Sequence, residues 1–251
     1  MQDKIKIVYK KRGQTPLDCI NEAKKANPGL LHLPLTYAGR LDPLAEGVLV
    51  ILIGDECLNK DEYLKLPKEY EVTILFGFAT DTYDLMGKVI NTKELEVQPL
   101  GPHEVGPLLP KFIGRITQSY PPYSSRTVNG KPLYKWAREG KLNEIIIPSH
   151  DVYVESIEII KDGFISGENL LNKIKKDISL VAGDFRQEEI INLWADILND
   201  KKEEQYKTIT LKVSCGGGVY VRGIAHDLGI ALGVSALALD IVRTKVGDYI
   251  L

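Results

Sequence analysis

Several stretches of the chain alternate hydrophobic and polar positions with the period of two that is typical of β-strands. Residues 48–53 form a continuous apolar run, which predicts a buried strand. Around 70–78, Tyr70, Val72 and Ile74 alternate with polar residues, as in a strand with one buried face. By the same criteria, further strands are predicted at 5–9, 151–160, 208–214 and 219–221.

Other stretches have the spacing and end signals of helices. Thr15 and Pro16 are typical of an N-cap and a first helical position, and this helix is expected to end at 27–29. Helices are also predicted at 133–139 and at 224–232, the latter closed by Gly233. Apolar residues recur at helical spacing from 165 to 199: Leu170, Leu171, Ile174, Ile190, Ile191, Trp194, Ile197 and Leu198. A polar, turn-rich segment is expected at 80–87, and a proline-rich connector at 99–110 is expected to lead into a short helix.

Strands precede and follow the long helical block. This order favours one α+β domain over 1–251, in which a mixed, mainly antiparallel sheet is flanked by helices. The block at 163–206 is then a helical insertion within that domain. With 251 residues, of which 44% are apolar, the chain can bury a sizeable core.

The composition narrows the possible compartments and cofactors. No apolar run approaches the roughly 20 residues of a membrane span, and the first residues lack the apolar region of a signal peptide, so we expect a soluble, cytoplasmic protein. Cys19, Cys57 and Cys215 have neither disulfide nor metal-site spacing, and the four histidines lie far apart. The triple glycine at 216–218 lacks the Lys-Ser/Thr of a phosphate loop. We therefore predict no metal and no cofactor.

The net charge is −2, but the charges are unevenly distributed. The segment 111–141 has seven basic residues and one acid, with Tyr120, Tyr123, Tyr134 and Trp136 interleaved, whereas 188–204 has six acids and two lysines. The basic segment could line a groove for nucleic acid. Alternatively, it is a solvated helix face beside a few core aromatics.

Asp42 is the candidate catalytic residue. It lies between Gly39 and Gly47, directly before a proline and before the buried strand at 48–53. The Asp-Pro bond disfavours helical backbone at Asp42, and the glycines permit tight turns or close approach to a ligand. Such a carboxylate would be held rigidly at the edge of a sheet. A purely structural turn is the alternative interpretation.

Four segments together resemble the TruB-type tRNA pseudouridine synthases. They are GRLDPLAEG at 39–47; KEYEV at 68–72 with TDTYD at 80–84; PPYSS at 121–125 with GKPLY at 130–134; and GVYVRG at 218–223. The resemblance implies the pseudouridine synthase fold and the isomerisation of uridine to pseudouridine, which needs no cofactor. It also implies that Asp42 is the nucleophile, toward either the sugar or the base.

The resemblance also assigns roles to other residues. Arg222 would pair with the Asp42 carboxylate, and Tyr220 would line the pocket. The period of two at 219–222 predicts that these two side chains share one face of a strand. Tyr70 would stack on the target base and help proton movement at C5, and Ile241 would supply an apolar wall. The substrate would be the T arm of tRNA, bound by a monomer.

The chain departs from the family pattern at three places. Bacterial members usually carry a histidine at the position of Tyr37, where it helps to evert the base; a tyrosine can stack there but cannot become cationic. The family's Lys-Pro-x-Gly is altered to KKRG at 10–13, which retains Lys10 as a candidate substrate-binding residue. The sequence ends at Leu251, where many relatives continue into a PUA domain, so we expect RNA contacts from 111–141 or from the insertion.

Two alternative functions stay open at this point. One is a guide-RNA-dependent relative of the archaeal and eukaryotic type. The other is a tRNA-folding chaperone that has the pocket but no turnover.

Overall fold

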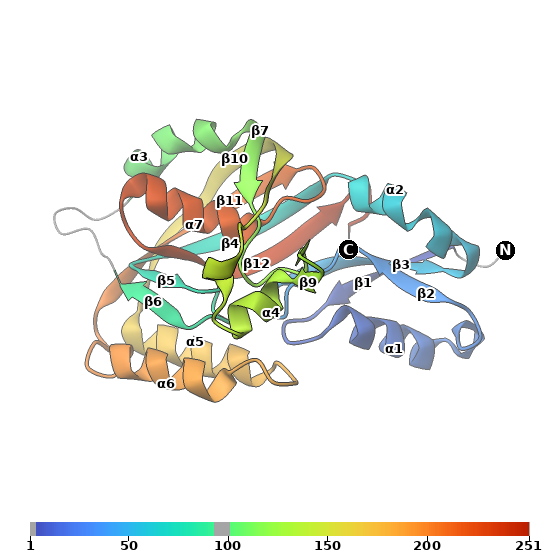
Figure 1. The fold of residues 1–251 in the computed structure, drawn as a ribbon, viewed down its shortest axis with the longest axis horizontal. Coiled ribbons are helices and arrows are strands. Elements are labelled where there is room, and N and C mark those ends of the chain that lie inside the picture. Colours follow the sequence, from blue (N-terminus) through green and yellow to red (C-terminus); the bar gives the residue numbers. More distant parts are fainter. Residues whose placement is uncertain (1–3, 93–100, 251) are drawn as a thin grey trace.

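The computed structural model describes residues 4–92 and 101–250, and Figure 1 shows their arrangement. The strands are β1 (Ile5–Lys10), β2 (Leu35–Ala38), β3 (Glu46–Ile53), β4 (Lys68–Phe76), β5 (Phe78–Thr80), β6 (Val89–Thr92), β7 (Gly114–Ser119), β8 (Thr127–Val128), β9 (Lys131–Pro132), β10 (Ser149–Ser166), β11 (Gln205–Cys215) and β12 (Ala236–Val246). The α-helices are α1 (Pro16–Ala26), α2 (Lys60–Lys65), α3 (Pro102–Val105), α4 (Leu133–Arg138), α5 (Gly167–Ser179), α6 (Gln187–Leu198) and α7 (Val221–Leu232).

The main sheet has eight strands in the order β1-β3-β12-β4-β11-β10-β7, with β2 paired to β3. The pairing of β12 with β3 is parallel, and the other pairings are antiparallel. The predicted mixed, mainly antiparallel sheet flanked by helices is therefore confirmed. The sequence analysis did not predict β12, although this strand joins the two halves of the sheet.

Alternate residues of the central strands face two separate apolar cores. On β4, Val72 and Ile74 pack with α7 and with the helical turns around 102–112, whereas Leu75 packs with α5 and α6. Figure 1 accordingly shows α3 and α7 on one side of these strands and α5 and α6 on the other. A bulge between Ala238 and Asp240 shifts the register of β12, so that Ile241 faces the same core as Val72.

The buried run that the sequence predicted at 48–53 is β3, and both of its faces are covered. Leu49 and Ile51 pack against α1, whereas Val50 and Leu52 pack in a separate cluster with Tyr63 of α2. The start of α1 is also as predicted, because Thr15 forms a capping box with Asp18. These contacts make β3 a rigid support for the loop that precedes it.

The helices α5 and α6 connect β10 to β11. These two long strands pair with each other, residues 154–166 of β10 with residues 205–215 of β11. Arg12 ties α5 to the N-terminal part of the chain, because its guanidinium lies 2.5 Å from Asp177 on α5 and 2.5 Å from Asp240 on β12. The same guanidinium lies 3.0 Å from Glu46 at the start of β3. Gly13 packs so tightly on Leu180 that an added Cβ would lie 2.6 Å from that residue.

Some element predictions were wrong. No strand forms at 219–221: Tyr220 caps the helix α7, which begins at Val221. The strand predicted at 70–78 ends at Phe76, because Gly77 takes a φ of +98° and separates β4 from β5. Within the predicted connector at 99–110, α3 already begins at Pro102, while Pro99 lies outside the described residues.

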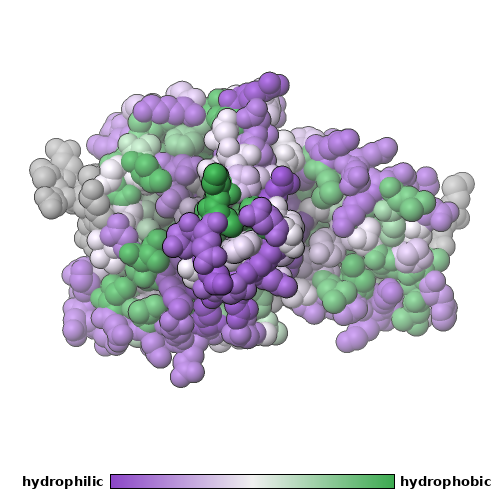
Figure 2. Space-filling model, viewed as in Figure 1, coloured by the Kyte–Doolittle hydropathy of each residue, from purple (hydrophilic) through white to green (hydrophobic). Residues whose placement is uncertain are grey.

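The helices of the described ranges are too short or too polar to cross a membrane. Figure 2 shows a largely hydrophilic face over α4, α5 and α6, with small, separate apolar patches. The exposed residues of α4 and the turn after it include Lys135, Arg138 and Lys141, which belong to the basic segment 111–141.

Candidate active site

Asp42 lies in the loop between β2 and β3, and glycines bracket the loop as the sequence predicted. Gly39 and Gly47 both adopt left-handed φ values, +78° and +114°. A Cβ on Gly47 would lie 2.1 Å from the carbonyl oxygen of Arg243 on the neighbouring strand β12. This position therefore excludes any other residue. The flanking residues Leu41 and Ala45 are buried in the core, so the loop is anchored on both sides of the carboxylate.

Lys10 lies directly beneath this loop. Its side chain is fully buried, and its ammonium donates to the carbonyl oxygens of Asp42 at 3.1 Å, Pro43 at 3.2 Å and Ala45 at 2.5 Å. Burial lowers the pKa of Lys10 to about 8, although the negative charges of Asp42 and Glu46 oppose this shift. Lys10 thus belongs to the site, but it holds the loop, and its ammonium does not face solvent as an RNA-gripping group would.

Arg222, the second residue of α7, brings its charge to Asp42. Its Nε lies 3.0 Å from Oδ2 of Asp42. Its other two nitrogens donate to backbone carbonyls, Nη1 to Thr82 at 2.6 Å and Nη2 to Tyr123 at 3.1 Å. The Arg222 side chain is 3% exposed and that of Asp42 is 36% exposed. A substrate can therefore reach the carboxylate from solvent, while the cation stays behind it.

Asp84 is a second carboxylate beside Arg222, and the sequence analysis did not select it. It is buried, accepts a hydrogen bond from Thr82 Oγ1 at 2.6 Å and another from the Met86 amide at 2.9 Å. Burial raises the pKa of Asp84 to about 6; Arg222 opposes this shift and Asp42 adds to it. Its place in the TDTYD segment at 80–84 was the signal that could have identified it.

Tyr70 and Ile241 lie at the same site as Asp42. Tyr70 packs against the core that holds Leu41 and Ile241, and burial raises the pKa of its phenol, which lies beside the charges of Arg243 and Asp42. Arg243 was also missed, although the sequence analysis selected its neighbour Ile241. Its buried guanidinium donates to the carbonyls of Val48 at 2.8 Å and Gly39 at 3.0 Å, and so fixes both ends of the Asp42 loop.

Tyr220 is positioned through its backbone. The side chain of Gln118 on β7 accepts from the Tyr220 amide at 2.8 Å and donates to its carbonyl at 2.9 Å. In a strand, the amide and carbonyl of Tyr220 would bond to a neighbouring strand. Here the side chain of Gln118 takes the place of that neighbour. The ring packs edge-on against Tyr120 and His150, and Arg222 lies 5.8 Å from its centroid. Tyr220 and Arg222 thus meet near Asp42, but on a helix start and not on one strand face.

Tyr37 lies on β2, where it pairs with Ile51, and packs in the cluster formed by α1 and β3. The ammonium of Lys60 lies 5.2 Å from its ring centroid. The ring is therefore packed among α1, β3 and Lys60 of α2.

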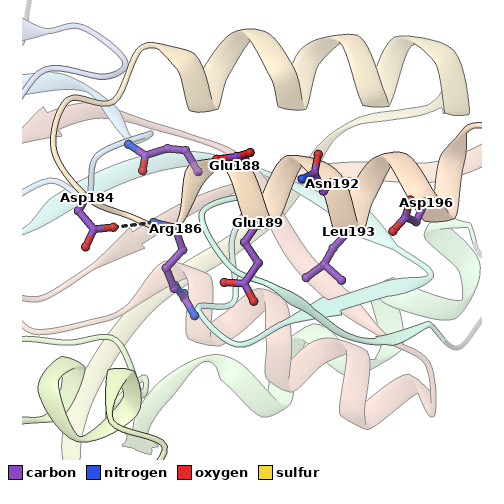
Figure 3. A pocket seen from close by; sticks show the side chains of 8 residues that line it. Asp184, Arg186, Glu188, Glu189, Asn192, Leu193 and Asp196 are labelled. Carbon is purple, nitrogen blue, oxygen red and sulfur yellow. Dashed lines mark hydrogen bonds between the residues drawn. The ribbon is translucent and has the colours of Figure 1, made fainter.

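A hollow of about 630 Å³ lies elsewhere on the surface, along α6. Figure 3 shows its lining side chains, several of which are acidic, among them Glu188, Glu189 and Asp196. The hollow does not include Asp42, Tyr70 or Arg222, and its acidic lining is unsuited to a phosphate backbone. Across residues 4–92 and 101–250, no three His, Cys, Asp or Glu side chains gather in a way that could hold a metal ion.

Comparison with known proteins places the chain in a family. Residues 34–168 match the family model described as TruB family pseudouridylate synthase, N-terminal domain. Two curated relatives are named tRNA pseudouridine synthase B. The one from Ligilactobacillus salivarius is 34% identical over 98% of this chain and 68% of the relative; the one from Nostoc sp. is 31% identical over 96% and 66%. The chain thus spans about two thirds of their length.

Solved structures share the fold at low sequence identity. The crystal structure of a Cbf5-Nop10-Gar1 complex matches with a TM-score of 0.58 at 16% identity, over 98% of this chain and 49% of the other. An H/ACA RNP bound to a substrate RNA containing 2'-deoxyuridine matches with a TM-score of 0.55. The chain, with its Asp42 loop, Tyr70 and Arg222 assembled on this fold, belongs to the TruB family of pseudouridylate synthases, enzymes of the isomerase class.

Proposed function

We propose that this protein is a tRNA pseudouridine-55 synthase, which isomerises the T-loop uridine of tRNA with Asp42 as the nucleophile. The ion pair between the exposed carboxylate of Asp42 and the buried guanidinium of Arg222 is the observation that carries this proposal. It fixes the carboxylate in place beside a buried cation while leaving it open to a substrate. The curated relatives named tRNA pseudouridine synthase B support tRNA as the substrate.

In the proposed reaction, the bond from uracil N1 to C1' of the ribose breaks, the base turns, and C5 joins C1'. The proton on C5 is lost and N1 gains one, so the change is an isomerisation that consumes no oxidant. Asp42 attacks the sugar or the base and is released at the end. Tyr70 stacks on the base. Stacking of this kind contributes about 1–3 kcal/mol per base and so offsets part of the cost of everting the uridine. Ile241 and Tyr220 wall the pocket.

The geometry also supports a division of labour around Asp42. Lys10 and Arg243 donate to carbonyls of the loop and Arg222 to the carbonyls of Thr82 and Tyr123, so the catalytic carboxylate is placed by buried cations that need not move during the reaction. We propose further that the whole chain 1–251 acts as one catalytic domain, a cytoplasmic monomer, and that the basic segment 111–141 contacts the T arm. A chaperone function needs none of this alignment, and we keep it as the second candidate.

The test is tritium release from a tRNA transcript labelled at C5 of uridine. Asp42→Asn should abolish release while tRNA binding survives, because an amide keeps the shape of the carboxylate but is not a nucleophile. Asp55→Asn, at an exposed aspartate outside the site, is the matched control and should release tritium normally. Undiminished release by the Asp42→Asn variant would remove Asp42 from the mechanism.

Two further results would separate the alternatives. A wild-type protein that binds tRNA but releases no tritium would favour the chaperone. A transcript with cytidine in place of the T-loop uridine should release nothing above background. Pseudouridine mapping in total RNA from a deletion strain would then identify any target besides the T loop, including the guided targets expected of the other alternative.

A further inference from the structure

Arg186 is the N-cap residue of α6 and directly precedes the helix, which begins at Gln187. Its backbone is left-handed, with φ 64° and ψ 29°, a conformation that costs free energy for a residue with a side chain. Figure 3 shows its side chain leaving the chain just before α6, at one end of the surface hollow. Such a conformation persists only where other contacts stabilise it, and Arg186 makes several.

The guanidinium of Arg186 binds two segments at once. Nη1 lies 2.6 Å from Oδ2 of Asp81, and Nη2 lies 3.2 Å from Oδ1, which is a bidentate pair. The same guanidinium lies 4.4 Å from the ring centroid of Tyr123. Asp81 also accepts a hydrogen bond from the Lys88 amide at 2.9 Å, which closes the turn-rich loop on itself. The Arg186 side chain is 16% exposed, so these contacts are largely shielded from solvent.

These two segments are the ones that hold Arg222. Thr82, the neighbour of Asp81, accepts from Nη1 of Arg222 at 2.6 Å, and Tyr123 itself accepts from Nη2 at 3.1 Å. The position of the Arg222 guanidinium therefore depends on two backbone carbonyls from separate parts of the chain. Arg186 joins the same two parts through the Asp81 carboxylate and the Tyr123 ring. A change in their spacing would move Arg222 relative to Asp42.

We propose that Arg186 is a positioning residue for the isomerisation, acting through the Thr82 and Tyr123 carbonyls on Arg222 and so on Asp42. This inference rests on the proposed function of Asp42. It gives the insertion a role in catalysis besides any contact with RNA. Arginine suits the role because its planar guanidinium can bind the Asp81 carboxylate with two hydrogen bonds and contact the Tyr123 ring at the same time. Lysine cannot do both.

The test compares Arg186→Ala and Arg186→Lys with a matched change in the same helix. Glu189→Gln removes the ion pair of α6 with Lys88 but reaches neither carbonyl that holds Arg222. Single-turnover tritium release at saturating enzyme should slow by about tenfold to a hundredfold in both Arg186 variants, because misplacement of a catalytic group has effects of this size. Their tRNA affinity should stay within about twofold of wild type, and Glu189→Gln should be unchanged in both measurements.

Two additional measurements separate positioning from a general loss of structure. Backbone amide exchange should accelerate at 81–88 and at 123–124 in the Arg186 variants, with β3 and β4 still protected. The double variant Arg186→Ala with Asp81→Asn should be no slower than the slower of the two single variants. The reason is that each change removes the same interaction, the pair between Arg186 and Asp81.

Several outcomes would overturn the inference. One is a wild-type single-turnover rate in Arg186→Ala, and another is unchanged amide exchange at 81–88 and 123–124. A third is weakened tRNA binding with an unchanged rate at saturation, which would make Arg186 an RNA contact. The exchange measurement does not require turnover. A wild-type protein that releases no tritium would refute the proposed function, whereas unchanged exchange would refute the role of Arg186 by itself.

Discussion

Nε of Arg222 lies 3.0 Å from Oδ2 of Asp42, yet its N–H has no aligned hydrogen-bond acceptor, so the contact is an ion pair. The other two nitrogens of the guanidinium are fixed by the carbonyls of Thr82 and Tyr123. The cation is thus held by the backbone and presents a charge to Asp42. Catalytic hydrogen bonds are often poorly aligned without substrate and tighten in the complex.

Arg222→Lys tests whether the geometry of this cation matters beyond its charge. Lysine has one nitrogen and cannot serve Asp42 and two carbonyls in the same arrangement. We expect the single-turnover rate of tritium release to fall by roughly a hundredfold, with tRNA affinity within a few-fold of wild type. Lys25→Arg, the reverse exchange at an exposed position on α1, is the control. Equal rates for Arg222→Lys and wild type would show that charge alone suffices.

Asp84→Asn tests the second carboxylate through pH-dependent stability. Burial raises the pKa of Asp84 to about 6, above the ordinary value of about 3.9. The folded protein therefore binds this proton more tightly than the unfolded chain. The stabilisation is fully present below about pH 4 and is lost as the pH rises through 6, up to roughly 3 kcal/mol in all. The amide does not titrate, so the variant should lack this loss.

Urea unfolding of wild type and Asp84→Asn at several pH values between about 4 and 7 measures the effect. The free energy of unfolding of the variant should fall less steeply with pH than that of wild type. Asp55→Asn, at an exposed position, should keep the wild-type slope. Parallel curves for Asp84→Asn and wild type would show that Asp84 titrates normally in the folded protein.

Local sequence signals predicted the supports of the site well. The glycines around Asp42, the buried run of β3 and the Thr15 cap each follow from neighbouring residues, and the structure confirms them. The alternation at 219–222 wrongly predicted a strand. The backbone amide and carbonyl of Tyr220 are hydrogen-bonded by the side chain of Gln118, a residue 102 positions away in sequence. A period-two pattern of four residues cannot reveal such a partner.

The buried charges were the other part that the sequence could not place. Lys10, Asp84 and Arg243 are residue types that are usually exposed, and Lys10 and Arg243 are bound by carbonyls from distant parts of the chain. Lys10, for example, reaches carbonyls 32 to 35 residues away. Only the assembled sheet brings these groups beneath the Asp42 loop, where they act as fixed charges.

Tyr70→Phe separates stacking from proton movement. The substitution keeps the ring that we propose to stack on the base but removes the phenol, whose pKa is raised by burial. We expect tRNA affinity to be retained and tritium release to slow by roughly a hundredfold, because release reports directly on loss of the C5 proton. Tyr63→Phe, which removes another phenol of raised pKa, is the control. Normal release by Tyr70→Phe would assign the proton transfer to another group.

Tyr37→His introduces the histidine that we expect at this position in bacterial members of the TruB family. The packing around Tyr37 argues against a gain in activity from this change. The Tyr37 ring packs in the cluster of α1 and β3, with the Lys60 ammonium 5.2 Å from its centroid. An imidazole fills less of this space and becomes cationic at acidic pH, where it would repel Lys60. We therefore expect a lower melting temperature and a lower kcat/KM, with a larger fall at about pH 6 than at about pH 8. Tyr37→Phe keeps the ring and should behave as wild type. A rise in the turnover of Tyr37→His would contradict this expectation. It would show that the side chain at position 37 leaves the cluster of α1 and β3 during the reaction and helps to evert the base.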